Sequence, residues 1–155
     1  MRVEYINPFV SAAYSVLEMV LGVVPDKGQL AMRPGIFTTQ QCSIVMGVTG
    51  KVEGTVIYGM SLTTADKIAS HMIGQPIRTF DALAASAIAE LGNMITGNAA
   101  ALLAEKGYTC DISPPSIIRG SNVKISTVNT PALVVPITLG EFGDLEINVS
   151  LQERK

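Results

Sequence analysis

The sequence contains two related copies of one unit, and this internal repeat strongly limits the folds that the chain can adopt. The segment SAAYSVLEMVLG at 11–22 aligns without a gap with SAIAELGNMITG at 86–97, and their apolar positions coincide. Downstream, IVMGVTGKVEGTVIYGMSL at 44–62 resembles LVVPITLGEFGDLEINVSL at 133–151 in its hairpin pattern. Each copy therefore predicts a helix followed by a hairpin. We expect both copies to pack into a single α+β domain covering residues 1–155, since this length suits one domain with a sizeable core.

The predicted sheet is antiparallel, with the long helices packed on one of its faces. Its clearest signal is the last strand, where apolar residues (Leu145, Ile147, Val149 and Leu151) alternate with polar ones (Glu146, Asn148, Ser150 and Gln152). This alternation predicts one buried face and one wet face. The other predicted strands are Cys42–Val48, Gly54–Met60, Val123–Val128 and Ala132–Leu139. Pro136 predicts an irregularity or an unpaired position in its strand, because proline lacks the N–H that a sheet needs.

Two shorter helices have start signals of their own. Asn7 before Pro8 reads as an N-cap followed by proline at the first helical position, and it predicts a helix ending near Gly22. Thr63 and Asp66 resemble a capping box and predict a second, short helix.

The longest predicted helix, residues 81–105, is mostly small or apolar but contains Glu90 and Asn93 three positions apart. Residues three or four apart share a helix face. One face therefore collects Ser86, Glu90, Asn93 and Gly97, and the opposite face collects Ala84, Ile88, Leu91, Ile95, Ala99 and Leu102. Because the apolar face packs inward, the acid and the amide are expected to point outward. Small neighbours would let another protein's backbone approach them closely.

A Glu-x-x-Asn pair is a weak signal alone, because polar residues at this spacing occur on most surface helices. Here the repeat adds information, since Ser15 and Glu18 occupy the equivalent positions of the first helix. The fold therefore does not require the pair. It offers neither a nucleophile nor a base held by a third group. A carboxamide can orient water for attack on a phosphoryl group, and a carboxylate can pair with a cation, so the two suit another protein's phosphoryl site.

Composition excludes several other classes of function. The net charge is -2 and no Lys/Arg cluster occurs, which disfavours nucleic acid as a partner. No apolar run approaches the ~20 residues of a membrane-spanning helix, so we expect a cytoplasmic protein without membrane insertion. Cys42, Cys110 and the single His71 cannot supply a conventional zinc set, and no metal or cofactor is expected in this chain. The two thiols are predicted to be buried and free, and His71 to lie on a helix surface or end.

The motifs together resemble the CheX branch of the CheC/CheX/FliY chemotaxis phosphatases over essentially the whole chain. They are Ser86-x-x-x-Glu90-x-x-Asn93 within AELGNMITGNAA, the following DISPPSIIRG and the preceding VTGKVEGTVIYGMS. The resemblance implies hydrolysis of the aspartyl phosphate of a CheY-like response regulator. It further implies that Glu90 pairs with the regulator's active-site lysine and that Asn93 orients the attacking water.

The same resemblance implies the remaining partners. Ser86, Gly97 and the family's proline, represented here by Pro114 or Pro115, are expected to help dock the regulator. Mg²⁺ is expected in the regulator's site, and the CheX branch is implied to form a homodimer joined through its sheet. CheC-type members carry two active helices, whereas this sequence matches at one.

Two other functions remain open from the sequence. The same helix in a noncatalytic receiver-binding or scaffold module would dock on a regulator without hydrolysing it; the presence of both Glu90 and Asn93 favours the enzyme. A small-ligand binding domain is a third class, but the sequence has no Gly-rich phosphate loop and no metal set to support it.

Overall fold

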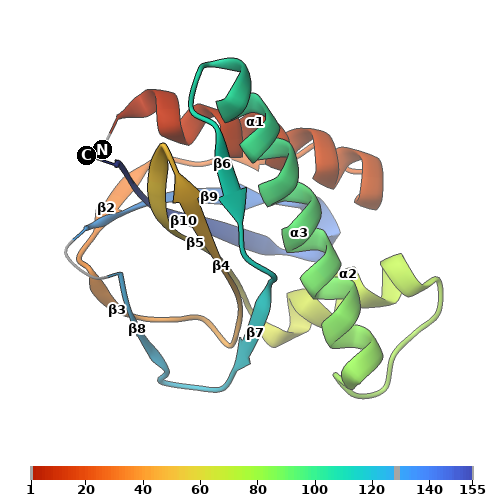
Figure 1. The fold of residues 1–155 in the computed structure, drawn as a ribbon. Coiled ribbons are helices and arrows are strands. Elements are labelled where there is room, and N and C mark those ends of the chain that lie inside the picture. Colours follow the sequence, from red (N-terminus) through yellow and green to blue (C-terminus); the bar gives the residue numbers. More distant parts are fainter. Residues whose placement is uncertain (1, 128–129, 155) are drawn as a thin grey trace.

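A computed structural model describes residues 2–127 and 130–154, with the backbone alone for 36–38, and it confirms the predicted α+β class (Figure 1). Its elements in chain order are α1 (Val3–Leu21), β1 (Asp26–Lys27), β2 (Ala31–Arg33), β3 (Ile36–Thr38), β4 (Cys42–Gly50), β5 (Val52–Met60), α2 (Leu62–Ile73), α3 (Ala82–Glu105), β6 (Cys110–Ile112), β7 (Ser116–Arg119), β8 (Lys124–Ser126), β9 (Ala132–Thr138), the 3-10 helix η1 (Gly140–Phe142) and β10 (Asp144–Glu153). Within the described residues, no helix is long and apolar enough to cross a membrane.

The sheet has the two-fold internal symmetry that the sequence repeat predicts. Its strand order is β1-β9-β10-β5-β4-β6, with β2 also pairing with β9 and β7 also pairing with β4. The hairpins β4–β5 and β9–β10 lie side by side in the centre, joined by the antiparallel pairing of β5 with β10. The short strands after each long helix pair with the hairpin of the other copy, β1 and β2 with β9, β6 and β7 with β4. This exchange makes the two copies one domain.

The three α-helices gather on one side of the large sheet (Figure 1). One apolar core joins their inward faces to the facing side of the strands, with α1, α2 and α3 contributing residues such as Phe9, Ile68 and Ile88 and the strands contributing residues such as Tyr58 and Ile147. The smaller sheet, β3 with β8, lies outside this core. The predicted arrangement of long helices on one face is confirmed.

The start signals predicted for α1 and α2 were both wrong by a few residues. Helix α1 begins at Val3, so Pro8 lies inside the helix, and the helix ends as predicted at Gly22, whose φ is 71°. Tyr5 and Ile6 are buried, and burying them favours the extra turn that sequence-based capping rules do not anticipate. Helix α2 is capped by Ser61, whose side chain accepts a hydrogen bond from the Thr64 amide, and not by the Thr63 capping box.

The last strand is confirmed, but its polar face is not uniformly wet. Asn148 is 1% exposed and Ser150 is 2% exposed, whereas the four alternating apolar residues are buried as predicted. Asn148 donates to the Ile57 carbonyl at 3.2 Å and accepts from Arg33, while Ser150 donates to the Thr130 carbonyl at 3.0 Å. Hydrogen bonds from distant segments therefore let these polar side chains be covered.

Of the two predicted effects of Pro136, the structure shows the unpaired position, because β9 runs through the proline without a break. Its carbonyl accepts from the Gly28 amide at 2.8 Å, so the proline nitrogen, which faces the same side, points toward the outer neighbours of β9. Those neighbours are two short strands, β1 opposite 137–138 and β2 opposite 132–134. The missing N–H therefore falls in the gap between them and leaves the pairing with β10 intact.

Candidate functional site

Helix α3 is held in one rotational setting by two close contacts with the sheet. Gly92 faces Ile44, and a Cβ at this position would lie 2.7 Å from the Ile44 Cγ2 atom. One turn later, the buried Thr96 hydroxyl lies 2.7 Å from the Tyr58 hydroxyl. Burial raises the pKa of Tyr58, which keeps this hydroxyl pair neutral. Because Gly92 and Thr96 face the sheet, the residues on the opposite side of α3 must face solvent.

That opposite side carries the predicted polar residues. Ser86, Glu90 and Asn93 are exposed and Gly97 is half-buried. Within the part of the chain that the structure describes, neither Glu90 nor Asn93 makes a side-chain hydrogen bond or an ion pair. A residue spacing of three places their Cβ atoms about 5–6 Å apart on a helix. The site therefore presents a carboxylate and a carboxamide together, both available to a partner.

The inward face of α3 follows the prediction with one exception. Ala84, Ile88, Leu91, Ile95 and Ala99 are all buried. Near the C-terminal end, Leu103 is buried, whereas the predicted Leu102 is half-buried. Five turns of 3.6 residues separate Ala84 from Leu102, so helical spacing alone does not explain why Leu102 is less buried. Leu103 lies about three turns after Gly92, and therefore on the side of α3 that faces the sheet.

The Pro114–Pro115 segment connects β6 to β7, which both contact α3, and it runs beside the helix in Figure 1. Pro114 is exposed and Pro115 is half-buried. The preceding Ser113 exchanges two hydrogen bonds with Gly47, its hydroxyl accepting from the Gly47 amide at 2.7 Å and its amide donating to the Gly47 carbonyl at 2.9 Å. The segment is thereby fixed to β4, the strand against which Gly92 of α3 packs.

Helix α1, the counterpart of α3, has a similarly exposed polar face without the pair. Ser15 and Glu18, at the positions equivalent to Glu90 and Asn93, are both exposed. The two helices thus share an inward apolar face and differ at the two positions where α3 has Glu90 and Asn93.

Sequence reasoning missed one residue of the exposed face of α3 that carries Glu90 and Asn93. Leu83, in the first turn of α3, is 55% exposed. It lies three positions before Ser86 and seven before Glu90, which places it on the same side of the helix. Helical spacing from Glu90 would have found it, but apolar residues were assigned to the inward face.

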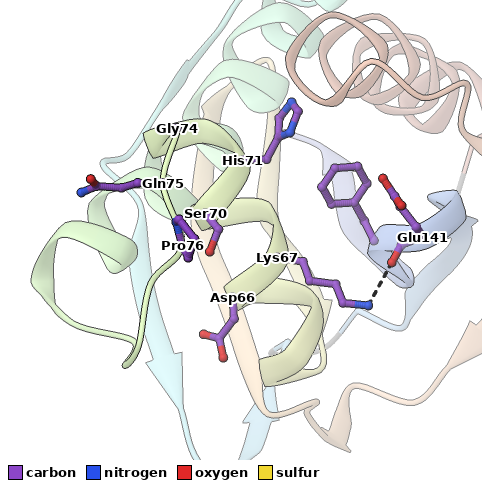
Figure 2. Close-up of a pocket in the computed structure, with 9 residues that line it drawn as sticks. Asp66, Lys67, Ser70, His71, Gly74, Gln75, Pro76 and Glu141 are labelled. Atoms are coloured by element: carbon purple, nitrogen blue, oxygen red, sulfur yellow. Dashed lines mark hydrogen bonds between the residues drawn. The ribbon is translucent and has the colours of Figure 1, made fainter.

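A groove with different residues lies elsewhere, between α2 and η1 (Figure 2). It measures about 760 Å³ and contains neither Glu90 nor Asn93. Its Lys67 amine donates to the Glu141 carbonyl at 3.0 Å. His71 is exposed in the last turn of α2, as predicted, and its ring meets Phe142 edge-to-face at 5.4 Å. Among the described residues that line the groove, no hydrogen bond or ion pair joins two acidic, basic or hydroxyl side chains.

The two thiols are free, but only Cys42 is fully buried as predicted, since Cys110 is half-buried on the outer strand β6. Burial raises the pKa of Cys42 to about 11 and also raises the pKa of Cys110, so both favour the unreactive thiol form. Among the described residues, no three His, Cys, Asp or Glu side chains come together in a way that could hold a metal ion.

Comparison with known proteins agrees with this architecture. A family model described as chemotaxis phosphatase CheX matches residues 42–138. The chain is 33% identical over 153 residues to a protein of Thermotoga maritima named CheY-P phosphatase CheX, covering 98% of both chains.

Solved structures give the same result. The CheX–CheY–BeF3–Mg²⁺ complex of Borrelia burgdorferi contains a chain with 35% identity and a TM-score of 0.84, covering 98% of this chain and 100% of that one. A chemotaxis protein CheX from Desulfovibrio desulfuricans has 28% identity and a TM-score of 0.85, covering 97% and 99%. The chain therefore belongs to the chemotaxis phosphatase CheX family.

Proposed function

We propose that this protein hydrolyses the aspartyl phosphate of a CheY-like response regulator and so ends a chemotaxis signal. One structural observation carries the proposal: Glu90 and Asn93 stand exposed and unpartnered on one face of α3, whose opposite face is fixed against the sheet by Gly92 and Thr96. The similarity to a protein named CheY-P phosphatase supports the reaction, and a CheX–CheY complex among the similar structures supports the partner.

Each residue of the pair has a separate task in this proposal. The Glu90 carboxylate pairs with a lysine ammonium in the regulator's active site, which aligns α3 with the phosphorylated aspartate. The Asn93 carboxamide has both an acceptor and donors, so it can hold a water molecule while facing a phosphoryl oxygen. Such positioning is the main contribution a protein makes to phosphoryl transfer.

The chemical step is a displacement at phosphorus. The oxygen of the held water attacks from the side opposite the aspartyl oxygen, a new P–O bond forms, and the bond to the aspartyl oxygen breaks. The aspartate leaves as a carboxylate with the electron pair, and the water's protons pass to the phosphate product and to solvent. This chain supplies orientation and no covalent intermediate.

The proposal leaves Mg²⁺ on the regulator. Among the described residues of this chain, no three His, Cys, Asp or Glu side chains come together to hold a metal ion. The CheX–CheY complex that contains Mg²⁺ and BeF3 is consistent with a metal on the CheY side.

We also propose that two small residues, Ser86 and Gly97, and the prolines Pro114 and Pro115 help to dock the regulator. Ser86 and Gly97 bracket Glu90 and Asn93, and a Cβ at Gly97 would meet no other atom within 4 Å, which indicates open space above the helix. Pro114 and Pro115 belong to the segment that Ser113 fixes to β4, between two strands that contact α3. Together they provide a low surface that a regulator can approach.

The direct test mixes the protein with the phosphorylated regulator of the same cell and follows acyl phosphate. We expect a substoichiometric amount of protein to consume all of the phosphorylated regulator, faster than its spontaneous decay. Binding of the regulator without faster decay would instead support the noncatalytic receiver-binding or scaffold module.

A further inference from the structure

Leu83 is a large apolar side chain that the fold holds in water beside the proposed site. Its side chain is 55% exposed, and within the described residues it is the one exposed large hydrophobic residue of α3. Ser86 lies one turn further along the same face, followed by Glu90 and Asn93. Leu83 therefore extends the exposed face that carries Glu90 and Asn93 toward the start of the helix.

The first turn of α3 is held in an orientation that keeps Leu83 exposed. The Asp81 side chain caps the helix by accepting from the Ala84 amide at 3.0 Å. Arg119 of β7 donates to the Phe80 carbonyl at 2.9 Å, and its guanidinium carbon lies 5.0 Å from the centre of the Phe80 ring. The Asp81 cap and the Arg119 side chain fix the backbone on both sides of the helix start. The backbone position of Leu83 is therefore fixed with its side chain exposed.

The spacing along α3 gives the three side chains a fixed order. At 1.5 Å per residue, Leu83 lies about 10 Å from Glu90 and about 15 Å from Asn93 along the helix axis. Between Leu83 and Glu90 the face carries the small residue Ser86, which leaves no bulky side chain to hold a partner away. Because Leu83, Glu90 and Asn93 follow in this order, a complementary surface on the regulator can match all three in only one direction of the helix.

We propose that Leu83 is a binding contact that enters an apolar patch on the regulator, about 15 Å from Asn93 along α3. This inference rests on the proposed function and assigns one more residue to the same interface. Burying the leucine on binding contributes affinity by removing apolar surface from water. Because Leu83 lies away from the reacting atoms, it affects the binding of the regulator and not the chemical step.

The test measures kcat, KM and regulator binding for Leu83→Ala, with Leu83→Met as the conservative variant. We expect Leu83→Ala to raise KM and the Kd for the BeF3-loaded regulator by roughly tenfold, the effect of about 1.4 kcal/mol of apolar contact. The value of kcat should stay within about twofold, and Leu83→Met should restore most of the affinity. Met19→Ala is the matched control, since Met19 is 68% exposed on α1 and should leave both constants unchanged.

The outcomes separate this inference from the proposed function. If the parent protein dephosphorylates the regulator and Leu83→Ala keeps the parent KM and Kd, Leu83 is an ordinary surface residue and the inference is overturned. A loss of kcat at unchanged KM would overturn it as well. A parent protein that does not accelerate dephosphorylation would overturn the proposed function itself.

Discussion

At the scale of single residues, the site depends on the contrast between what α3 buries and what it exposes. Gly92 and Thr96 are buried against the sheet, and they determine which way Glu90 and Asn93 point. In the described part of the chain, the exposed pair makes no side-chain hydrogen bond or ion pair, so the folded state does not depend on it for stability. Substitutions at Glu90 and Asn93 should therefore change function while leaving the free energy of unfolding almost unchanged.

Glu90→Gln tests the proposed charge pair. Removing the negative charge should weaken binding of the phosphorylated regulator by roughly tenfold at low salt, because an interfacial charge pair is lost. The loss should shrink as salt is added, since ions screen partly exposed charges. Glu105→Gln is the matched control, because Glu105 is exposed at the end of the same helix. A binding loss that is equal at low and high salt would show that Glu90 acts through its shape and hydrogen bonds instead.

At the scale of elements, α1 and α3 are two versions of one helix, and only one carries the pair. Both pack an apolar face into the same core, and both leave a polar face exposed. The α3 helix differs by approaching β4 at Gly92 so closely that a side chain would not fit. This close packing holds in place the helix that carries Glu90 and Asn93.

Gly92→Ala should be destabilising and Gly97→Ala should not. The added methyl at Gly92 would lie 2.7 Å from the Ile44 Cγ2 atom, so the core must shift, at a cost of about 1–3 kcal/mol. At Gly97 the methyl meets nothing within 4 Å, and alanine should stabilise the helix by up to about 1 kcal/mol. Urea unfolding of both variants checks this. Equal stability changes would mean that α3 does not depend on the close approach at Gly92.

Glu18→Ala tests whether the first helix is inactive. Ser15 and Glu18 occupy the positions equivalent to Glu90 and Asn93, so α1 lacks both an acid and an amide in the required places. We expect turnover within about threefold of the parent, the scale of an exposed substitution outside the site. A loss as large as that of Glu90→Ala, measured in parallel, would contradict a single active helix.

At the scale of the whole molecule, the sequence repeat was sufficient to predict the architecture. Two helix-plus-hairpin copies, the antiparallel sheet and the helices on one face are all present. The pairing of each copy's short strands with the other copy's hairpin was not predicted, because two- to four-residue strands carry too few residues for a periodic signal. Such pairing is decided by long-range contacts.

The candidate site was also predictable, since helical spacing places Glu90 and Asn93 on one exposed face. The errors have a common cause in tertiary contacts that local rules do not include. Burial of Tyr5 and Ile6 makes α1 begin before its proline. A hydrogen bond from Arg33 to Asn148, and one from Ser150 to the Thr130 carbonyl, allow these two polar side chains to be buried. Leu83 was missed because exposure of an apolar residue cannot be read from its type alone.

We propose a homodimer formed through a sheet edge. Among the described residues, the two-stranded β3–β8 sheet has no further strand on either outer edge. Unpaired edge backbone groups are a template for another strand. Light scattering at micromolar concentration should give twice the 16.4 kDa mass of one chain. A monomer mass would count against the dimer and would leave the site on α3 unaffected.

The water-positioning role of Asn93 is the central claim, and Asn93→Ala tests it most directly. Stopped-flow dephosphorylation should show kcat lowered by roughly a hundredfold or more, the scale lost with one preorganised polar group, while the Kd for the BeF3-loaded regulator changes little. Asn93→Asp should also fail, because a carboxylate would face the phosphoryl oxygens without an amide donor. Asn98→Ala is the matched control, an exposed asparagine on the same helix, and should keep the parent kcat. If Asn93→Ala loses binding but keeps a near-parent kcat, Asn93 is a docking contact and the mechanism is wrong.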